Sequence, residues 1–162
     1  GQDPYPTPGV ANGLAFSYQG ASVPQSLRII FKELKRDGFG DRQTADLTDW
    51  ASQGVMLLNT VLTTEHGIPS HHKKLGWDIL ISRTLQVIHA LDHPFVVMAW
   101  GAPAKETLKR YIGPKPNRLM LESCHPIAEN YSGGKIKFTG CGHFSKCNEF
   151  LVENGLSPIN WT

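Results

Sequence analysis

The sequence predicts an α/β fold: a three-layer αβα sandwich built on a short, mainly parallel four-stranded sheet. Short apolar runs that suit buried strands alternate along the chain with segments whose apolar residues recur at helical spacing. The strand-like runs are apolar throughout, as in parallel sheets that helices cover on both faces. A length of 162 residues, with 40% of them apolar, suits one domain over residues 1–162.

The first half of the chain is predicted to contain loops, two helices and one strand. Residues 1–25 carry repeated glycine, proline and asparagine, which favour turns. A helix is expected over residues 26–37, because its apolar residues share one stripe and Ser26 is a candidate N-cap. A short helix over 47–53 and a buried strand over 55–59 follow.

The second half continues the alternation of helices and strands. After a loop over 63–75, it is expected to contain a helix over 77–91, a strand over 95–100, a helix over 102–111, a strand over 118–122 and a helix over 143–154. Ser145 is a candidate cap for the last helix, and Gly155 lies just past its end.

Polar residues follow the ends of the predicted strands. Asn59, Gly101 and His125 lie at or near three of these ends. Asp3 would lie at a fourth if a first strand ended at Gly1, so we expect the chain to lack the N-terminal part of its domain. Ligands of open α/β sheets bind beyond the carboxyl ends of the strands, and these residues are therefore expected to form one site.

The motifs around these residues resemble those of the family-1 uracil-DNA glycosylases, which cut uracil out of DNA. The matching segments are Gly1-Gln2-Asp3-Pro4-Tyr5, Gly13-Leu14-Ala15-Phe16-Ser17, Leu57-Leu58-Asn59-Thr60-Val61-Leu62-Thr63, Ala99-Trp100-Gly101 and Ser123-Cys124-His125-Pro126. The similarity runs along nearly the whole chain. It implies a base-excision repair hydrolase that flips uracil out of the DNA, cleaves its N-glycosidic bond, leaves an abasic site and needs no cofactor.

The resemblance assigns Asp3 and His125 to catalysis. Asp3 would orient the attacking water and stabilise the sugar as it becomes oxocarbenium-like, a task that requires a fixed negative charge. His125 would donate a hydrogen bond to uracil O2 and stabilise the negative charge that develops on the leaving base.

The resemblance also assigns the residues that bind uracil. The Asn59 amide would pair with N3–H and O4 of uracil, whereas cytosine presents the opposite polarity at those positions. Tyr5 would block the 5-methyl group of thymine, and Phe16 would stack on the flipped base. Gln2 belongs to the same uracil-binding set.

Two further segments match DNA-binding segments of the family. Pro24-Gln25-Ser26 matches a loop rich in proline and serine, although it has fewer prolines than its relatives. Gly101 and Ala102 match a Gly-Ser phosphate contact in which alanine here replaces serine. Such loops hold the DNA backbone through hydroxyl and amide contacts.

The loop after His125 departs from the family pattern. Relatives insert a leucine into the duplex where the base leaves, and here Glu129 occupies that position. A carboxylate is unfavourable against stacked bases and phosphates. We therefore expect Ile127 or Tyr131 to replace the wedge, or the loop to have another role.

No metal ion is expected from the sequence. Cys141, His143 and Cys147 have a spacing that is compatible with zinc, but they lie in a segment that resembles a family segment without metal. His71, which replaces a family serine, forms with His72 a pair that we interpret as part of a loop.

The expected partners are uracil-containing single-stranded and double-stranded DNA, with a proteinaceous glycosylase inhibitor or replication proteins as further candidates. A net charge of +2 does not by itself indicate a nucleic-acid binder, so lysines, backbone amides and helix N-termini would hold the phosphates. We expect a monomer that does not enter a membrane. The expected location is intracellular. It would be the cytoplasm in a prokaryote, and the nucleus or the host cell in a eukaryote or a virus.

Two other function classes stay open at this point. A glycosylase fold could serve mainly to bind DNA or a replication partner, which the altered loop after His125 favours. A small-molecule α/β hydrolase is compatible with the separate motifs, but the matched set favours the glycosylase. Retention of Asp3, Asn59 and His125 favours the enzyme.

Overall fold

The computed structural model of the chain describes residues 1–130 and 137–162. Its elements, in chain order, are α1 (Gln25–Arg36), α2 (Thr48–Ser52), the 3-10 helix η1 (His71–Lys74), α3 (Trp77–Ala90), β1 (Phe95–Trp100), α4 (Ala102–Tyr111), β2 (Arg118–Ser123), the 3-10 helix η2 (Pro126–Asn130) and α5 (His143–Glu153). The helices and the two strands therefore begin and end close to the bounds that the apolar periodicity predicts.

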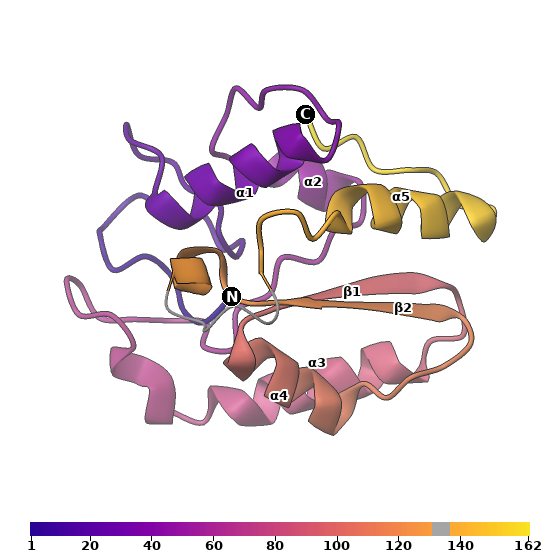
Figure 1. Ribbon diagram of the computed structural model, residues 1–162. Coiled ribbons are helices and arrows are strands. Elements are labelled where there is room, and N and C mark those ends of the chain that lie inside the picture. Colours follow the sequence, from indigo (N-terminus) through magenta and orange to yellow (C-terminus); the bar gives the residue numbers. More distant parts are fainter. Residues whose placement is uncertain (131–136) are drawn as a thin grey trace.

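The helices lie in two layers on either side of the strands, with α1, α2 and α5 on one face and α3 and α4 on the other (Figure 1). Strands β1 and β2 pair in parallel, with Phe95 opposite Arg118 and Trp100 opposite Ser123. The connection between them is α4, as parallel pairing requires. The predicted α/β sandwich is confirmed.

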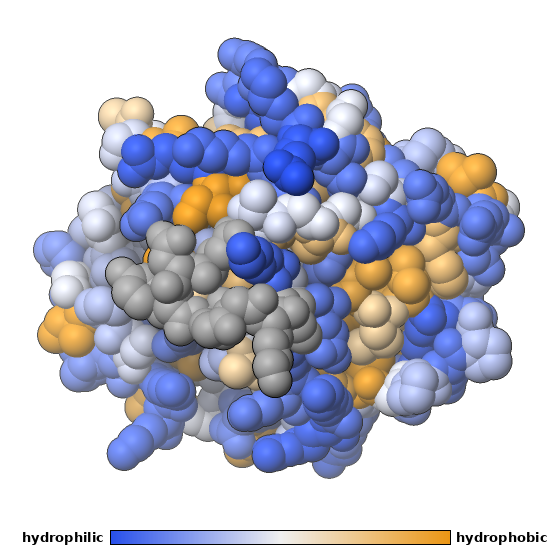
Figure 2. Space-filling model, in the orientation of Figure 1, coloured by the Kyte–Doolittle hydropathy of each residue, from blue (hydrophilic) through white to orange (hydrophobic). Residues whose placement is uncertain are grey.

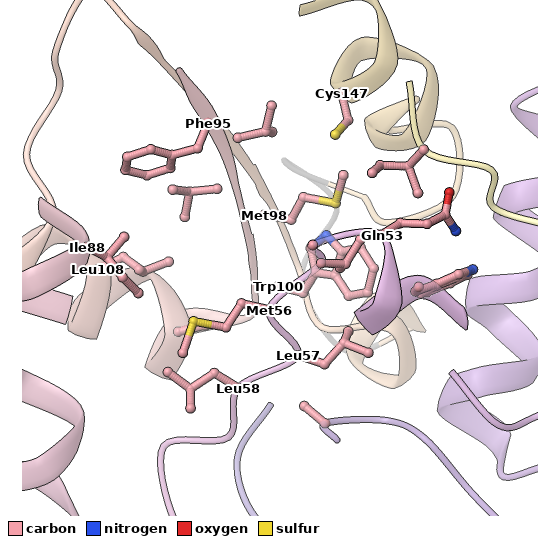
Figure 3. A pocket seen from close by; sticks show the side chains of 18 of the residues that line it. Gln53, Met56, Leu57, Leu58, Ile88, Phe95, Met98, Trp100, Leu108 and Cys147 are labelled. Carbon is pink, nitrogen blue, oxygen red and sulfur yellow. The ribbon is translucent and has the colours of Figure 1, made fainter. Parts of the chain in front are cut away.

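The sheet of the described residues has two strands rather than the expected four. Residues 55–59, predicted as a strand, form no ladder with β1. An apolar cavity of about 690 Å³ lies between them, with Met56, Leu57 and Leu58 on one side and Phe95 and Met98 on the other (Figure 3). The strand expected to end at Gly1 has no residues in this sequence and stays a prediction.

The cavity reaches the surface near the end of α5. Leu156 lines the cavity and is also exposed. Val152, on α5, is exposed as well. Figure 2 shows hydrophobic surface around this part of the molecule, among largely polar surroundings. The lining of the cavity is mostly apolar, and it extends to Gly1, Phe16 and Trp100, which also belong to the site described below.

Two apolar clusters fill the two layers. The larger one joins α1, α2 and α5 through fully buried side chains: Leu27, Ile30, Leu34, Leu47, Trp50, Phe138, Phe144, Cys147 and Trp161. The smaller one, with Ile81, Leu85 and Ile112, lies under α3 and α4. Burial of this apolar surface is the main favourable term that holds the helices on the strands.

Two predicted helix caps are wrong. Pro24 occupies the N-cap of α1, and Ser26 is buried inside the first turn of the helix. Gly142 occupies the N-cap of α5, while the backbone N–H and hydroxyl of Ser145 both donate to Asp37, at 2.8 and 2.6 Å. A carboxylate at the end of α1 thus supplies the negative charge that a helix N-terminus favours.

The buried carboxylate of Glu33 holds the segment before α5. It accepts hydrogen bonds from the backbone N–H groups of Gly140, at 2.7 Å, and Gly142, at 3.1 Å. A buried charge needs such partners, because burial without them is costly. Glu33 therefore fixes the approach of the chain to His143 and α5.

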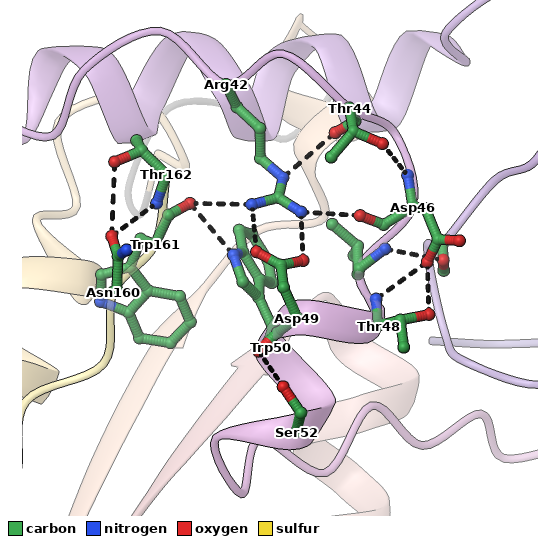
Figure 4. A network of polar contacts seen from close by, with 12 residues as sticks. Arg42, Thr44, Asp46, Thr48, Asp49, Trp50, Ser52, Asn160, Trp161 and Thr162 are labelled. Carbon is green, nitrogen blue, oxygen red and sulfur yellow. Dashed lines mark hydrogen bonds and ion pairs between the residues drawn. The ribbon is translucent and has the colours of Figure 1, made fainter.

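Arg42 ties the loop before α2 to the C-terminal residues (Figure 4). Its guanidinium donates to both oxygens of Asp49, at 2.8 and 2.5 Å, and to the carbonyl of Trp161 at 3.3 Å. The indole N–H of Trp50 donates to the same Trp161 carbonyl at 3.0 Å. The fork geometry of arginine suits this simultaneous pairing, so one side chain joins segments 119 positions apart.

We expect His143 to make the fold sensitive to acid. Burial lowers the pKa of His143 to about 4, and Nδ1 accepts a hydrogen bond from Trp100 Nε1 at 3.0 Å. Between pH 6.5 and 4 the unfolded chain binds a proton that the folded chain does not, so the free energy of unfolding falls as the pH falls. The loss should reach about 3 kcal/mol near pH 4.

Urea unfolding at pH 7.5 and pH 4.5 measures this term. In His143→Gln, whose side chain does not titrate but can still accept from Trp100, the drop in stability between the two pH values should be smaller by about 2–3 kcal/mol. Equal drops in the two proteins would contradict the assignment. The comparison cancels the contribution of acidic residues such as Asp49, whose pKa is lowered by its hydrogen bond with Arg42.

Candidate active site

Backbone pairing brings the start of the chain against residues 58–61. The Gly1 amine donates to Leu58 O at 2.9 Å, Thr60 N–H donates to Gly1 O at 3.0 Å, and Val61 N–H donates to Gln2 O at 2.9 Å. A Cβ at Gly1 would lie only 2.1 Å from Asn59 Oδ1. Residue 1 therefore has to be glycine for the Asn59 amide to keep this position.

The carboxylate of Asp3 is held by the loop that precedes η1. Its Oδ2 accepts a hydrogen bond from the Ser70 backbone N–H at 2.7 Å, and the Ser70 hydroxyl accepts one from Gln2 Nε2 at 2.7 Å. Ser70 has a left-handed backbone, with φ of 61°. Within the described residues no hydrogen bond reaches Oδ1, which leaves that oxygen available for a water or a ligand.

Aromatic rings connect the Asp3 turn to His125. The Tyr5 hydroxyl donates to the Phe16 carbonyl at 3.3 Å, and the Phe16 ring lies 5.9 Å from the His125 ring and 5.8 Å from Trp100. Phe16 also has a left-handed backbone, with φ of 65°. A strained backbone at a non-glycine residue is common at functional sites, and here it places Phe16 beside His125.

The surroundings of His125 fix its orientation. Gly101, at the end of β1, has φ of 98°, and a Cβ there would lie 3.2 Å from His125 Cβ. Gly101 N–H donates to Ser123 O at 3.0 Å, which aligns the ends of the two strands. A side chain at residue 101 would therefore push against His125.

The protonation of His125 follows from its partners. Its Nδ1 lies 3.3 Å from the backbone N–H of Ile127, which can only donate, so Nδ1 accepts and Nε2 carries the proton. Burial lowers the pKa of His125. Near pH 7 the ring is therefore a neutral donor through Nε2.

The residues that match DNA-binding segments of the family lie around this site. Gln25 and Ser26 lie in the first turn of α1, and α1 packs against η2. Burial raises the pKa of Tyr5, and a hydrogen bond with Ser26 partly opposes this rise. Ala102, next to Gly101, is exposed at the start of α4. Pro24 is the N-cap of α1. The structure thus gathers these segments on the side of the sandwich where β1 and β2 end.

The structure describes only some of the residues that could act as the wedge. Ile127 is 38% exposed and follows His125 and Pro126 directly. Tyr131 lies outside the described residues, as does the side chain of Glu129. Ile127 is therefore the apolar candidate whose exposure can be assessed.

Sequence reasoning missed Ser70, the residue that holds Asp3. Its function depends on a backbone N–H and a left-handed conformation, and neither leaves a clear mark in the sequence. It also missed that the Pro6 carbonyl accepts a hydrogen bond from Gly67 N–H at 2.9 Å. Cys141, His143 and Cys147 belong to no group of metal donors among the described residues.

Comparisons with known proteins agree on one family. The chain is 44% identical over 163 residues to "Uracil-DNA glycosylase 2" of Listeria monocytogenes, with 99% of this chain and 70% of that protein covered. It is equally similar to a uracil-DNA glycosylase of Pseudomonas putida, covering 99% of this chain and 69% of that protein. No family model matches the chain.

A solved structure supports the same conclusion. The mimivirus uracil-DNA glycosylase superposes with a TM-score of 0.87 at 27% identity, covering 99% of this chain and 65% of that one. A variant of the viral protein with one substitution has been solved in complex with UGI, with a TM-score of 0.87 and 66% of that chain covered. The chain thus spans about two thirds of the length of the proteins that it matches.

Proposed function

The chain belongs to the uracil-DNA glycosylase family, and we infer from this that it hydrolyses the N-glycosidic bond of deoxyuridine in DNA. The observation that carries the proposal is the presence of a fixed carboxylate and a neutral hydrogen-bond donor among the residues of this site. The Asp3 carboxylate accepts a hydrogen bond from Ser70, and the ring of His125, a neutral donor, lies 5.9 Å from the ring of Phe16.

These two groups suit the two charges that develop in the reaction. As the bond between C1′ and the base nitrogen breaks, its electron pair leaves with uracil and the sugar becomes cationic. Asp3 stabilises that cation and orients a water through Oδ1, and His125 Nε2–H donates to the oxygen of the departing base. The water oxygen then bonds to C1′, and its proton passes to Asp3, leaving an abasic sugar and a uracil anion that is later protonated.

Residues beside Asp3 and His125 would recognise uracil. Asn59, held next to Gly1, would accept from N3–H and donate to O4. Phe16 offers a ring face near His125 for stacking, and Tyr5, half-buried beside Phe16 and Tyr18, would fill the space next to C5. Because these edges are paired in a duplex, the base has to leave the stack to be read.

We propose uracil-containing DNA, single-stranded and double-stranded, as the partner of this site. The mimivirus relative solved with UGI supports the expectation that a protein inhibitor binds this chain as well. An intracellular location follows from a DNA substrate and stays a proposal. No helix of the described residues is long and apolar enough to cross a membrane.

The alternative of a protein that only binds DNA or a replication partner is less favoured. The family relatives are named as glycosylases, and the described residues keep both proposed catalytic groups in supporting contacts. A purely DNA-binding protein would not need a carboxylate fixed by a backbone amide.

We expect Asp3→Asn to lower the rate of uracil release by about 100-fold or more, the scale for loss of one preorganised electrostatic group. The amide oxygen can still accept from Ser70 N–H, so the fold and DNA binding should be retained. Release of free uracil from a single-stranded oligonucleotide, measured in single turnover, tests this. Asp92→Asn, which removes an exposed carboxylate elsewhere, serves as the control and should keep the full rate.

Normal turnover in Asp3→Asn would remove Asp3 from the mechanism. Absence of uracil release from the unaltered chain, with DNA binding retained, would contradict the proposed function and support the DNA-binding alternative.

We expect Ile127→Ala to slow uracil release from duplex DNA by roughly tenfold or more, while the rate on single strands changes little. Unstacking and unpairing a base costs a few kcal/mol in a duplex and least in a single strand, so an apolar wedge matters most there. The substitution keeps the backbone N–H that donates to His125. Initial rates on single-stranded, U·G and U·A substrates at one salt concentration provide the measurement.

Ile79→Ala is the matched control, because Ile79 is an exposed isoleucine on α3, in the layer across the strands from α1 and α5. An equal loss on all three substrates in Ile127→Ala would mean that another residue of the loop acts as the wedge.

A further inference from the structure

The loop between the site and α3 brings together three side chains that can bind a metal ion, one carboxylate and two imidazoles. Donor atoms of Glu65, His71 and His72 all lie within 4.8 Å of one another. Glu65 Oε2 and His71 Nε2 are 3.0 Å apart, and the two imidazole rings are 5.4 Å apart in an edge-to-face arrangement. Among the described residues this is the single group of its kind. The sequence suggests only a histidine pair, and the structure adds the carboxylate.

The backbone of the loop is built so that Glu65 returns toward the histidines. Glu65 and Ile68 form an antiparallel bridge, and Ile68 N–H donates to Glu65 O at 3.1 Å. The Thr64 hydroxyl donates to Ile68 O at 2.8 Å. Ser70, in its left-handed conformation, then starts η1 with His71 and His72 as its first residues. The three side chains therefore lie on a turn with several internal hydrogen bonds.

His72 already has the outer partner that a metal-binding imidazole commonly has. Its Nδ1 lies 2.8 Å from the Thr63 hydroxyl oxygen, which also accepts from Trp77 Nε1 at 3.0 Å. This contact orients the ring and leaves Nε2 for a ligand. On His71 it is Nε2 that faces the Glu65 carboxylate.

We propose that Glu65, His71 and His72 form a binding site for a divalent transition-metal ion of the zinc type, with water as the fourth ligand. Two imidazoles and one carboxylate suit Zn²⁺, whereas Mg²⁺ prefers oxygen ligands. Bonds of about 2.0–2.1 Å in a tetrahedron place ligand atoms roughly 3.4 Å apart, which is close to the Glu65–His71 separation. The ion would take the place of the direct contact between Glu65 and His71.

The ion would act on the loop and not on the substrate. His71 directly follows Ser70, whose backbone N–H holds Asp3. An ion that joins Glu65 to both histidines closes residues 65–72 into a ring and should hold Ser70 in its left-handed conformation. This inference goes beyond the proposed function, and its test needs no DNA and no measurement of uracil release.

Calorimetric titration of the whole chain with Zn²⁺ tests the site, with the absorption spectrum of bound Co²⁺ as a report on its coordination. The unaltered chain should bind one ion. Glu65→Gln and His71→Asn change exposed side chains, so they should leave the fold intact while weakening Zn²⁺ binding by at least about 100-fold. Thr63→Val should weaken it by about tenfold, because it removes the contact that orients His72.

Two controls separate this site from other zinc-binding groups. His66→Asn removes an exposed histidine of the same loop that is not in the group, and Cys141→Ser removes a partly exposed thiol. Both should bind Zn²⁺ as the unaltered chain does. Hydrogen exchange should also slow at the amides of residues 65–72 when Zn²⁺ is added, and this protection should be absent in His71→Asn.

Failure of the unaltered chain to bind Zn²⁺ would overturn the proposal. So would unchanged affinity in the double variant Glu65→Gln/His71→Asn, or loss of affinity in Cys141→Ser or His66→Asn instead. Binding without any slowing of exchange at residues 65–72 would overturn the proposed effect on the loop.

Discussion

The backbone pairing of Gly1 and Gln2 with residues 58–61 is the constraint on which the site depends. Three hydrogen bonds of 2.9 to 3.0 Å fix the register, and the close approach of Gly1 to Asn59 allows no side chain at residue 1. This register places Asp3 where the Ser70 N–H can hold it. A shift by one residue would separate the carboxylate from its donor and move Asn59 away from the same opening.

The second requirement is that the two reacting groups have opposite electrostatic character before a substrate arrives. Asp3 offers a negative charge with one oxygen already satisfied, and burial keeps His125 neutral with Nε2 as its donor. Such preorganisation stabilises charge that appears mainly in the transition state. Gly101 contributes indirectly, because the lack of a Cβ there leaves room for His125.

Local patterns were sufficient to predict most elements but not the contacts between distant segments. Helical spacing located α1, α3 and α5, and apolar runs located both strands, with bounds within a residue or two. Ser26 was wrongly predicted as a cap because its burial in the α1 core cannot be read locally. Ser70 holding Asp3 depends on backbone conformation and contacts across more than 60 positions. The resemblance supplied the site residues, whereas their supporting contacts required the structure.

The protonation state of His125 is the most direct test of this arrangement of charges. Nitrogen-15 NMR of the imidazole, titrated through neutral pH in the free protein and with a single-stranded oligonucleotide bound, reports both tautomer and charge. Our account predicts a neutral ring at pH 7 with the proton on Nε2 and a pKa below the ordinary histidine value. A cationic ring at pH 7, or a proton on Nδ1, would contradict it.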